Sequence, residues 1–263
     1  MPAGVGHDGR AKMRRIEHVG IHDIQFKEIR TMKNNGNIRL VVAFAMLLGF
    51  IGQIAGPLVP SAKAAEPAYV QNTSYGSTYG EWTARWWQWV LSIPAAVNPN
   101  LDSSGVQCAQ GQTDDVWFLA GNFGGTVARA CTIPAGKPIF LPLINTVSFK
   151  PNGNETLLTL RGLAAGFIDT VDVSQLTFTI DGQAVVRDLS KFRVRSPSFT
   201  VLAPSGGILP PGQLTLPGNS DSIVSDGYWM LLNPLPTGRH TIKWHAQTNS
   251  GFVVDVTYNL IIQ

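Results

Sequence analysis

The C-terminal stretch FVVDVTYNLII, residues 252–262, is the part of the sequence that decides the fold class. Apolar and polar side chains alternate along most of it, and a period of two is typical of a β-strand with one buried face. The side chains expected on that face are Phe252, Val254, Val256, Tyr258, Leu260 and Ile262. The end of the chain is therefore predicted to be a long strand that covers a core.

Strand patterns also recur upstream of this segment. Residues 176–186, LTFTIDGQAVV, contain two strand halves around Asp181-Gly182, a dipeptide typical of hairpin turns. The run IFLPLI at residues 139–144 is apolar throughout, which favours a strand covered on both faces, and its Pro142 favours an edge or a bulge. Shorter strands are expected at residues 116–120, 126–133, 228–232 and 240–245.

Two segments follow the helical period instead. In residues 80–94, GEWTARWWQWVLSIP, the apolar positions are three and four apart and form one stripe that includes Trp82, Trp86 and Trp89. We expect these three indoles to pack the helix onto the sheets. A second helix is predicted at residues 154–169.

The order of these elements indicates the fold class. No strand–helix–strand alternation occurs, and turn residues 122–125 predict that the strands at 116–120 and 126–133 pair as a hairpin. An apolar share of 44% excludes disorder, and 27 Gly with 17 Pro exclude a mostly helical protein. The prediction is a mainly β protein, an antiparallel β-sandwich of jelly-roll or immunoglobulin-like type with two helices.

The N-terminal region has the layout of a secretory signal peptide. Residues 40–56, LVVAFAMLLGFIGQIAG, carry no charge, follow Lys33 and Arg39, and precede the small-residue pattern Ala-Lys-Ala at 62–64. We therefore predict export to the periplasm or the outside of the cell. The alternative is an uncleaved anchor helix, which would then be the protein's contact with a membrane.

The predicted organisation has four parts. We expect translation to start at Met32, where the signal peptide begins, and Met1 is the alternative start. The residues before Met32 are therefore assigned to an over-long gene model. The parts are this extension at 1–31, the signal peptide at 32–64, a flexible lead-in at 65–79 and a single β-sandwich domain at 80–263.

The charge and motif content narrow the range of partners. Residues 65–263 contain 11 Lys and Arg against 13 Asp and Glu, so no nucleic-acid partner is expected. Neither a dinucleotide fingerprint nor a phosphate loop occurs, and no cofactor is expected. His240 and His245 are five apart on a predicted strand and point to opposite faces, so no metal site is expected. The oligomeric state is left open.

The mature region contains two cysteines, Cys108 and Cys131. In an exported protein an even cysteine count favours a disulfide, which we predict here as a structural bridge. A catalytic or metal-binding thiol is the alternative.

Several strings together resemble a family of exported bacterial proteins that has no assigned activity. They are GEWTARWWQW (80–89), the segment around Cys108, VWFLAGNFGG (116–125), CTIPAGKPIF (131–140), DGYWMLLNPLPTGRHTI (226–242) and DVTYNL (255–260). The resemblance covers most of residues 80–262. It implies export and a fold with a Trp-rich helix followed by a β-sandwich, and it implies no chemistry.

Two features are candidates for ligand binding. Trp87, beside Gln88, falls off the apolar stripe of its helix, and an exposed indole can stack on a sugar. Lys191, Arg193 and Arg195 alternate with apolar residues, which on a strand places three cations on one face, and Arg187 extends the set. An anionic surface polymer would suit such a face, although nearby acids would neutralise it.

These features favour an exported, non-enzymatic binding or envelope-associated protein that recognises a glycan or an anionic surface polymer. The alternative is a glycan or ester hydrolase, for which Glu81, Asp221 and Asp226 are the candidate catalytic acids. A second alternative is a structural envelope or matrix component whose Trp-rich helix docks a partner.

Overall fold

The computed structural model describes residues 69–70, 75–149, 155–208 and 223–263, which all belong to one unit, Pro60–Gln263. The predicted extension at 1–31 and the signal peptide at 32–64 lie outside the described residues, as does part of the lead-in. The described residues form α1 (Tyr79–Ser92), α2 (Leu157–Ile168), the 3₁₀ helices η1 (Ala95–Val97), η2 (Val173–Gln175) and η3 (Leu189–Phe192), and the strands β1 (Trp117–Phe118), β2 (Gly125–Ile133), β3 (Ile139–Ser148), β4 (Thr177–Ile180), β5 (Gln183–Ala184), β6 (Arg193–Arg195), β7 (Val224–Leu232), β8 (Gly238–Gln247) and β9 (Val253–Ile262).

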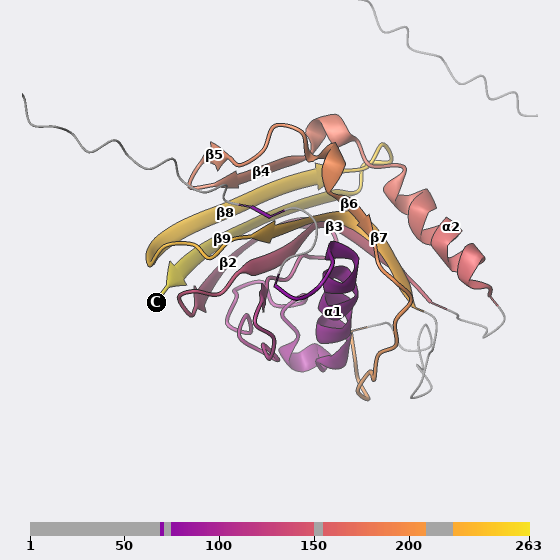
Figure 1. Ribbon diagram of the computed structural model, residues 1–263, viewed down its shortest axis with the longest axis horizontal. Helices are drawn as coiled ribbons and strands as arrows, with labels where there is room; N and C mark the ends of the chain where they lie inside the picture. Colours follow the sequence, from indigo (N-terminus) through magenta and orange to yellow (C-terminus); the bar gives the residue numbers. More distant parts are fainter. Residues whose placement is uncertain (1–68, 71–74, 150–154, 209–222) are drawn as a thin grey trace, which may run out of the picture. The chain divides into compact units, whose positions relative to one another are not determined.

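The strands form two mixed sheets (Figure 1). One has the order β1-β3-β7-β6 and the other the order β2-β9-β8-β4-β5. The prediction of a mainly β protein with two α-helices is confirmed for the part of the chain that the structure describes. No helix in that part is long and apolar enough to cross a lipid bilayer.

Two of the ladders are parallel, so the sheets are not purely antiparallel as expected. β2 runs parallel to β9 from the pair Gly125–Val254 to the pair Ile133–Ile262, and β1 runs parallel to β3. The prediction that β1 and β2 pair as a hairpin is also wrong. β1 and β2 belong to different sheets, and the turn after β2 carries the chain across to β3 in the other sheet.

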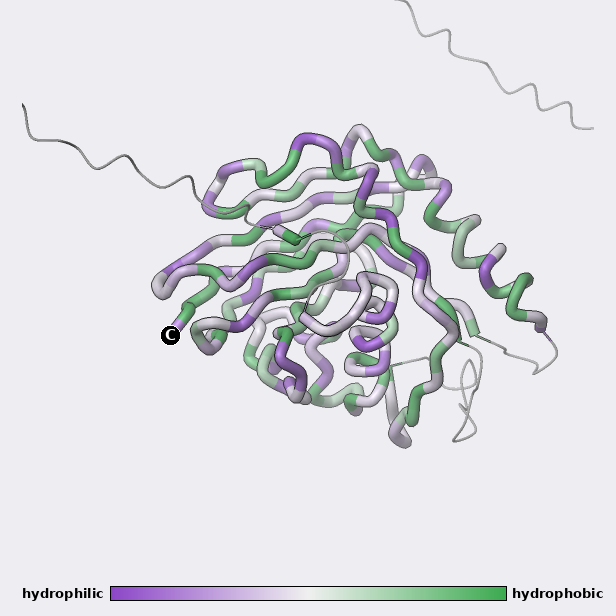
Figure 2. Tube along the Cα trace, viewed as in Figure 1, coloured by the Kyte–Doolittle hydropathy of each residue, from purple (hydrophilic) through white to green (hydrophobic). Residues whose placement is uncertain are grey.

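The core between the sheets contains the apolar faces that the sequence indicates. Along β9 the side chains alternate between buried and partly exposed, and the buried set is Val254, Val256, Tyr258, Leu260 and Ile262. β8 follows the same alternation, and the antiparallel β8–β9 pair extends over both strands. In Figure 2 apolar residues run along the strands of both sheets. The last strand therefore forms as its period predicts.

A second core lies on the outer face of the four-stranded sheet, where α1 packs. Trp82, Trp86 and Trp89 are each at most 6% exposed and contact residues of β1, β3 and β7. The role predicted for this stripe is confirmed. Because one core lies on each side of them, β7 and the first part of β3 are buried on both faces. The register of β3 shifts between Pro142 and Ile144, as the proline in this run predicts.

The two cysteines form a disulfide, as predicted. Cys108, in the segment before β1, is bonded to Cys131 on β2, and the described residues include no free cysteine. The bond encloses 22 residues, and a loop of this length contributes about 3 kcal/mol in the chain-entropy account.

A buried arginine joins the loops beside α1 to the five-stranded sheet. Arg129 on β2 is 2% exposed, and its guanidinium donates to the backbone carbonyls of Asp102, Asn100, Ala120 and Gly121. It also donates to the hydroxyl of Tyr258 on β9. A buried cation needs several acceptors, and a planar five-donor group can serve this many carbonyls at once.

We expect Arg129→Lys to lower the free energy of unfolding by about 2–4 kcal/mol, because lysine keeps the charge but leaves several of these carbonyls unpaired. Urea denaturation followed by circular dichroism measures the loss. Arg239→Lys is the matched control, since Arg239 is exposed on β8 and should change stability by less than about 0.5 kcal/mol. Equal stability of the two variants would contradict the role given to Arg129.

Candidate functional site

Trp87 does not lie on the surface, so the expectation of an exposed stacking indole is wrong. Its side chain is 5% exposed and meets the Trp86 ring edge to face, with 5.1 Å between ring centroids. Trp87 is buried because the second core includes it as well as the three indoles of the apolar stripe. Trp87 instead lines a small cavity, while the indole nitrogens of Trp86 and Trp89 donate to backbone carbonyls.

Gln88 lies in an open groove of about 570 Å³ along the polar side of α1. Its amide nitrogen donates to the carbonyl of Thr200, 2.8 Å away. Arg85 and Asp114 also line the groove, with 3.9 Å between their charged atoms, and the Arg85 guanidinium lies 4.8 Å from the centre of the Trp82 ring. The lining also contains the nearly buried Trp89 and Phe118 and the exposed Leu202, so it combines polar groups with apolar carbon.

The four predicted cations do not form one strand face. Lys191 lies in η3, where its nearest carboxylate is that of Asp188 at 3.5 Å, and Arg187 is exposed before this helix. Only Arg193 and Arg195 belong to β6. The short 3₁₀ turn breaks the alternation that the sequence suggested, since its residues do not point to alternate sides.

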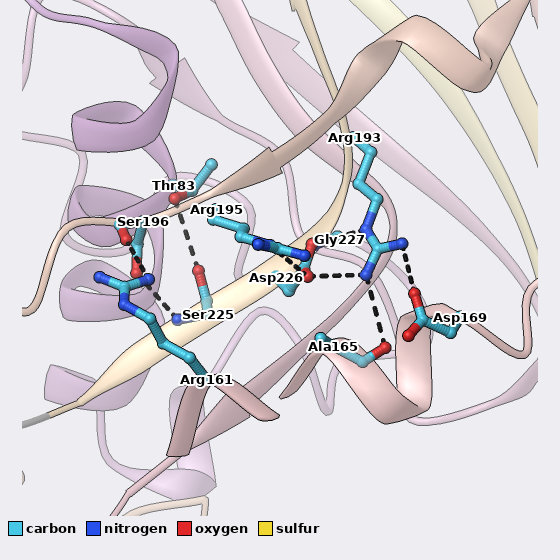
Figure 3. A network of polar contacts seen from close by, with 10 residues as sticks. All are labelled: Thr83, Arg161, Ala165, Asp169, Arg193, Arg195, Ser196, Ser225, Asp226 and Gly227. Carbon is cyan, nitrogen blue, oxygen red and sulfur yellow. Dashed lines mark hydrogen bonds and ion pairs between the residues drawn. The ribbon is translucent and has the colours of Figure 1, made fainter. Parts of the chain in front are cut away.

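Arg193 and Arg195 both bind Asp226, which lies on β7 beside β6 (Figure 3). The Asp226 side chain is 2% exposed, and one of its oxygens accepts from Arg193 at 2.9 Å and from Arg195 at 3.2 Å. The other oxygen accepts from Arg193 and from the backbone N–H of Gly227. Arg193 also donates to Asp169, just after α2, at 2.6 Å.

This arginine–aspartate cluster is a structural junction. Arg161 of α2 donates to the carbonyl of Ser196, and the Ser196 hydroxyl accepts from the backbone N–H of Ser225 (Figure 3). Ser225 in turn donates to Thr83 on α1. The network joins both helices to β6 and β7. Carboxylates pair with the two β6 cations here, as the alternative of nearby acids anticipated.

The candidate catalytic acids serve structural purposes where they are described. Glu81 forms a capping box with Thr78 at the start of α1, and the backbone N–H and the hydroxyl of Thr78 both donate to its carboxylate. These two hydrogen bonds lower the pKa of Glu81. Asp226 is held by two arginines, and Asp221 lies outside the described residues. The described members of this set therefore have separate structural partners.

The two histidines are bound by different carboxylates. His240 contacts Asp181 at 2.7 Å, and His245 contacts Asp255 at 2.8 Å. The described residues contain no group of three or more side chains able to hold a metal ion.

Sequence reasoning missed Arg85 and Asp114 as groove residues, as well as Asn100 and Asn145 beside Trp87. None of the four belongs to a motif. Asn100 and Asp114 reach α1 because the segment between α1 and β1 folds back against the helix, whereas Asn145 comes from β3, and no local pattern signals these contacts.

Comparisons with known proteins do not assign a family. No family model matches the chain, and no curated protein matches it. Among solved structures, "Solution Structure of Amebosin" matches with a TM-score of 0.18 and 10% identity, covering 52% of this chain and 96% of that one.

Replacement of Asp226 by asparagine should lower the free energy of unfolding by about 3 kcal/mol, because Arg193 and Arg195 lose the buried carboxylate that they share. Thermal and urea denaturation measure the loss. Asp115→Asn is the control, since Asp115 is exposed, and should shift stability by less than about 0.5 kcal/mol. If the variant is as stable as the wild type and gains affinity for polyanions, the cluster is an anion site and not a junction.

The capping box predicts a pH-dependent contribution from Glu81. Since folding lowers the pKa of this carboxyl, the ionised form stabilises α1 at neutral pH, and that contribution disappears as the pH falls through the folded-state pKa, below 4.5. Glu81→Gln keeps an acceptor without the charge. We expect the wild type to be the more stable protein at neutral pH and the two midpoints to converge in acid. A difference that stays constant with pH would refute this.

Proposed function

We propose that the protein is exported and acts outside the cytoplasm as a non-enzymatic binding protein for a glycan. The signal-peptide layout of residues 32–64 supports export. The disulfide between Cys108 and Cys131 supports it independently, because such bonds persist in oxidising compartments.

We also propose that the fold is an immunoglobulin-like sandwich and not a jelly roll. If β1 and β2 share the role of the first strand, the sheet orders become A-B-E-D and A-G-F-C-C′, which is the strand order of immunoglobulin domains. The parallel β2–β9 ladder then follows from a first strand that crosses to the second sheet. β1 departs from this pattern, because it runs parallel to β3.

The groove beside α1 is the observation that carries the proposal of a glycan ligand. Its lining offers donors and acceptors from Arg85, Gln88 and Asp114 next to apolar carbon, of which the Leu202 side chain is the most exposed part. Ligand sites typically combine apolar surface with a few placed polar groups, and a volume of about 570 Å³ is within their usual range. Sugars present hydroxyls at their edges and C–H groups on their faces, which suits both parts of this lining.

The charges favour a glycan over an anionic polymer. The β6 arginines are paired with Asp226, and the Arg85 charge in the groove faces Asp114. A polyanion would have to displace these carboxylates, whereas a neutral glycan can bind beside them.

The two other functions find less support. Hydrolysis by paired carboxylates needs a second acid, and Asp114 is the one carboxylate among the described lining residues of the groove. Docking of a partner by the Trp-rich helix needs an exposed apolar patch, whereas the indoles of Trp82, Trp86 and Trp89 are buried.

A glycan array probed with the purified protein tests the proposal, followed by isothermal titration calorimetry with the glycans retained. We expect binding of neutral glycans without cleavage, and about tenfold weaker binding in Arg85→Ala and Gln88→Ala, which each lose a polar contact. Arg187→Ala and Lys191→Ala are matched controls, because both residues lie outside the groove lining.

Three outcomes would overturn the proposal. Retention of no glycan removes the binding function. Retention of acidic polymers alone, with loss in Arg187→Ala and Lys191→Ala, favours the anionic-polymer alternative. Cleavage of a retained glycan would make the protein a hydrolase.

A further inference from the structure

A second, smaller cavity next to α1 has a lining separate from that of the groove. Its volume is about 120 Å³, and Trp87 of α1 forms part of its wall. The other walls come from Asn100 after η1, from Gly121 to Phe123 between β1 and β2, from β3 around Asn145, and from Phe252 and Val254 at the start of β9. No residue of this lining lines the groove.

Three buried polar atoms of this lining have no hydrogen-bond partner within the protein. They are the indole nitrogen of Trp87, the side-chain oxygen of Asn100 and the side-chain nitrogen of Asn145. Trp87 is 5% exposed and Asn100 6% exposed. Folded proteins rarely leave buried donors and acceptors unpaired, so three in one small cavity point to a bound polar group.

The surrounding structure holds these atoms in place. The carbonyls of Asn100 and Gly121 both accept from the buried Arg129 guanidinium. Asn145 lies opposite Gly227 in the β3–β7 ladder, and a Cβ at Gly227 would approach the Asn145 Cβ to 2.7 Å. Trp87 is fixed by its edge-to-face contact with Trp86. The residues that carry these atoms are therefore held in place around the cavity. Because the three atoms themselves are fully buried, a ligand reaches them only after a small shift of the lining.

The chemistry of the lining defines the class of ligand. No lining residue carries a charge, so neither an anion nor a cation is favoured. A group that accepts from Trp87 and Asn145 and donates to Asn100 must contain both acceptors and donors, which hydroxyl groups supply. Phe123, which is 53% exposed, and Phe252 add aromatic carbon to the same lining. The volume is below the roughly 300 Å³ of ordinary ligand pockets, so the ligand is small.

We propose that this cavity is a second binding site, specific for a small neutral polyhydroxyl group, either a free polyol or monosaccharide or the terminal unit of a glycan. The site does not depend on the function proposed for the groove, because the two linings are separate. Trp87 is then a ligand residue after all, but through its buried N–H and not through an exposed ring face.

Saturation-transfer NMR of the purified protein with glucose, mannose, galactose and myo-inositol tests the site, and titration calorimetry gives the affinity. Neutral di- and trisaccharides of the same sugars form a second arm, and tighter binding in that arm identifies the terminal unit of a glycan as the ligand. We expect at least one of these compounds to bind. Trp87→Phe, which keeps the ring but removes the donor, should weaken binding about tenfold.

A steric variant gives an independent test. A Cβ at Gly121 would lie 3.2 Å from Pro142 and 3.9 Å from the Asn100 oxygen, so Gly121→Ala reduces the space and should also weaken binding about tenfold. Arg239→Ala is the control, because Arg239 is exposed and lies outside both linings, and it should leave polyol binding unchanged. Urea denaturation of each variant shows whether it is folded, and Gly121→Ala retains the test if Trp87→Phe unfolds.

The proposal fails if no compound binds, or if Trp87→Phe and Gly121→Ala, once folded, both bind like the wild type. It also fails if a crystal structure soaked with these compounds shows only ordered water on the three polar atoms, since water could satisfy such groups. If the groove binds glycans and any of these results is also obtained, the cavity proposal fails and the function proposed for the groove stands.

Discussion

The packing of α1 against the outer face of the four-stranded sheet is the constraint on which the rest of the structure depends. It places β3 and β7 between two cores, which is why both strands contain unbroken apolar runs. It also fixes the segment between α1 and β1, where Trp89 donates to the carbonyl of Gln110, and the residue after β1, where Trp86 donates to the carbonyl of Leu119. The groove and the small cavity are both lined in part by α1, so both candidate sites depend on this one helix.

The buried charges of Arg129 and Asp226 have structural partners within the protein. Arg129 is surrounded by carbonyl oxygens, and Asp226 is surrounded by two guanidinium groups and a backbone N–H. Each group is satisfied within the protein, as a buried ion must be.

The two sites differ in what they can recognise. The groove is open and several times larger than the cavity, so it suits an extended ligand that lies along α1. The cavity is lined by five separate segments and contains unpaired donors and an acceptor, so it suits a single unit held by direct hydrogen bonds. Arg129 links the cavity to the five-stranded sheet, because it donates to the carbonyls of Asn100 and Gly121 in the cavity wall.

Sequence patterns predicted those elements whose signal is local. The period of two in β9, the stripe of Trp82, Trp86 and Trp89, the bulge at Pro142 and the cysteine pair all follow from neighbouring residues or from a simple count. Tertiary structure alone decided the parallel partner of β2, the burial of Trp87, the capture of Arg193 and Arg195 by Asp226, and the meeting of Trp87 with Asn100 and Asn145. A periodic pattern reports which face of an element is apolar, but it does not report which distant segment covers that face. Burial, neutralisation and unpaired hydrogen-bonding groups depend on that distant partner.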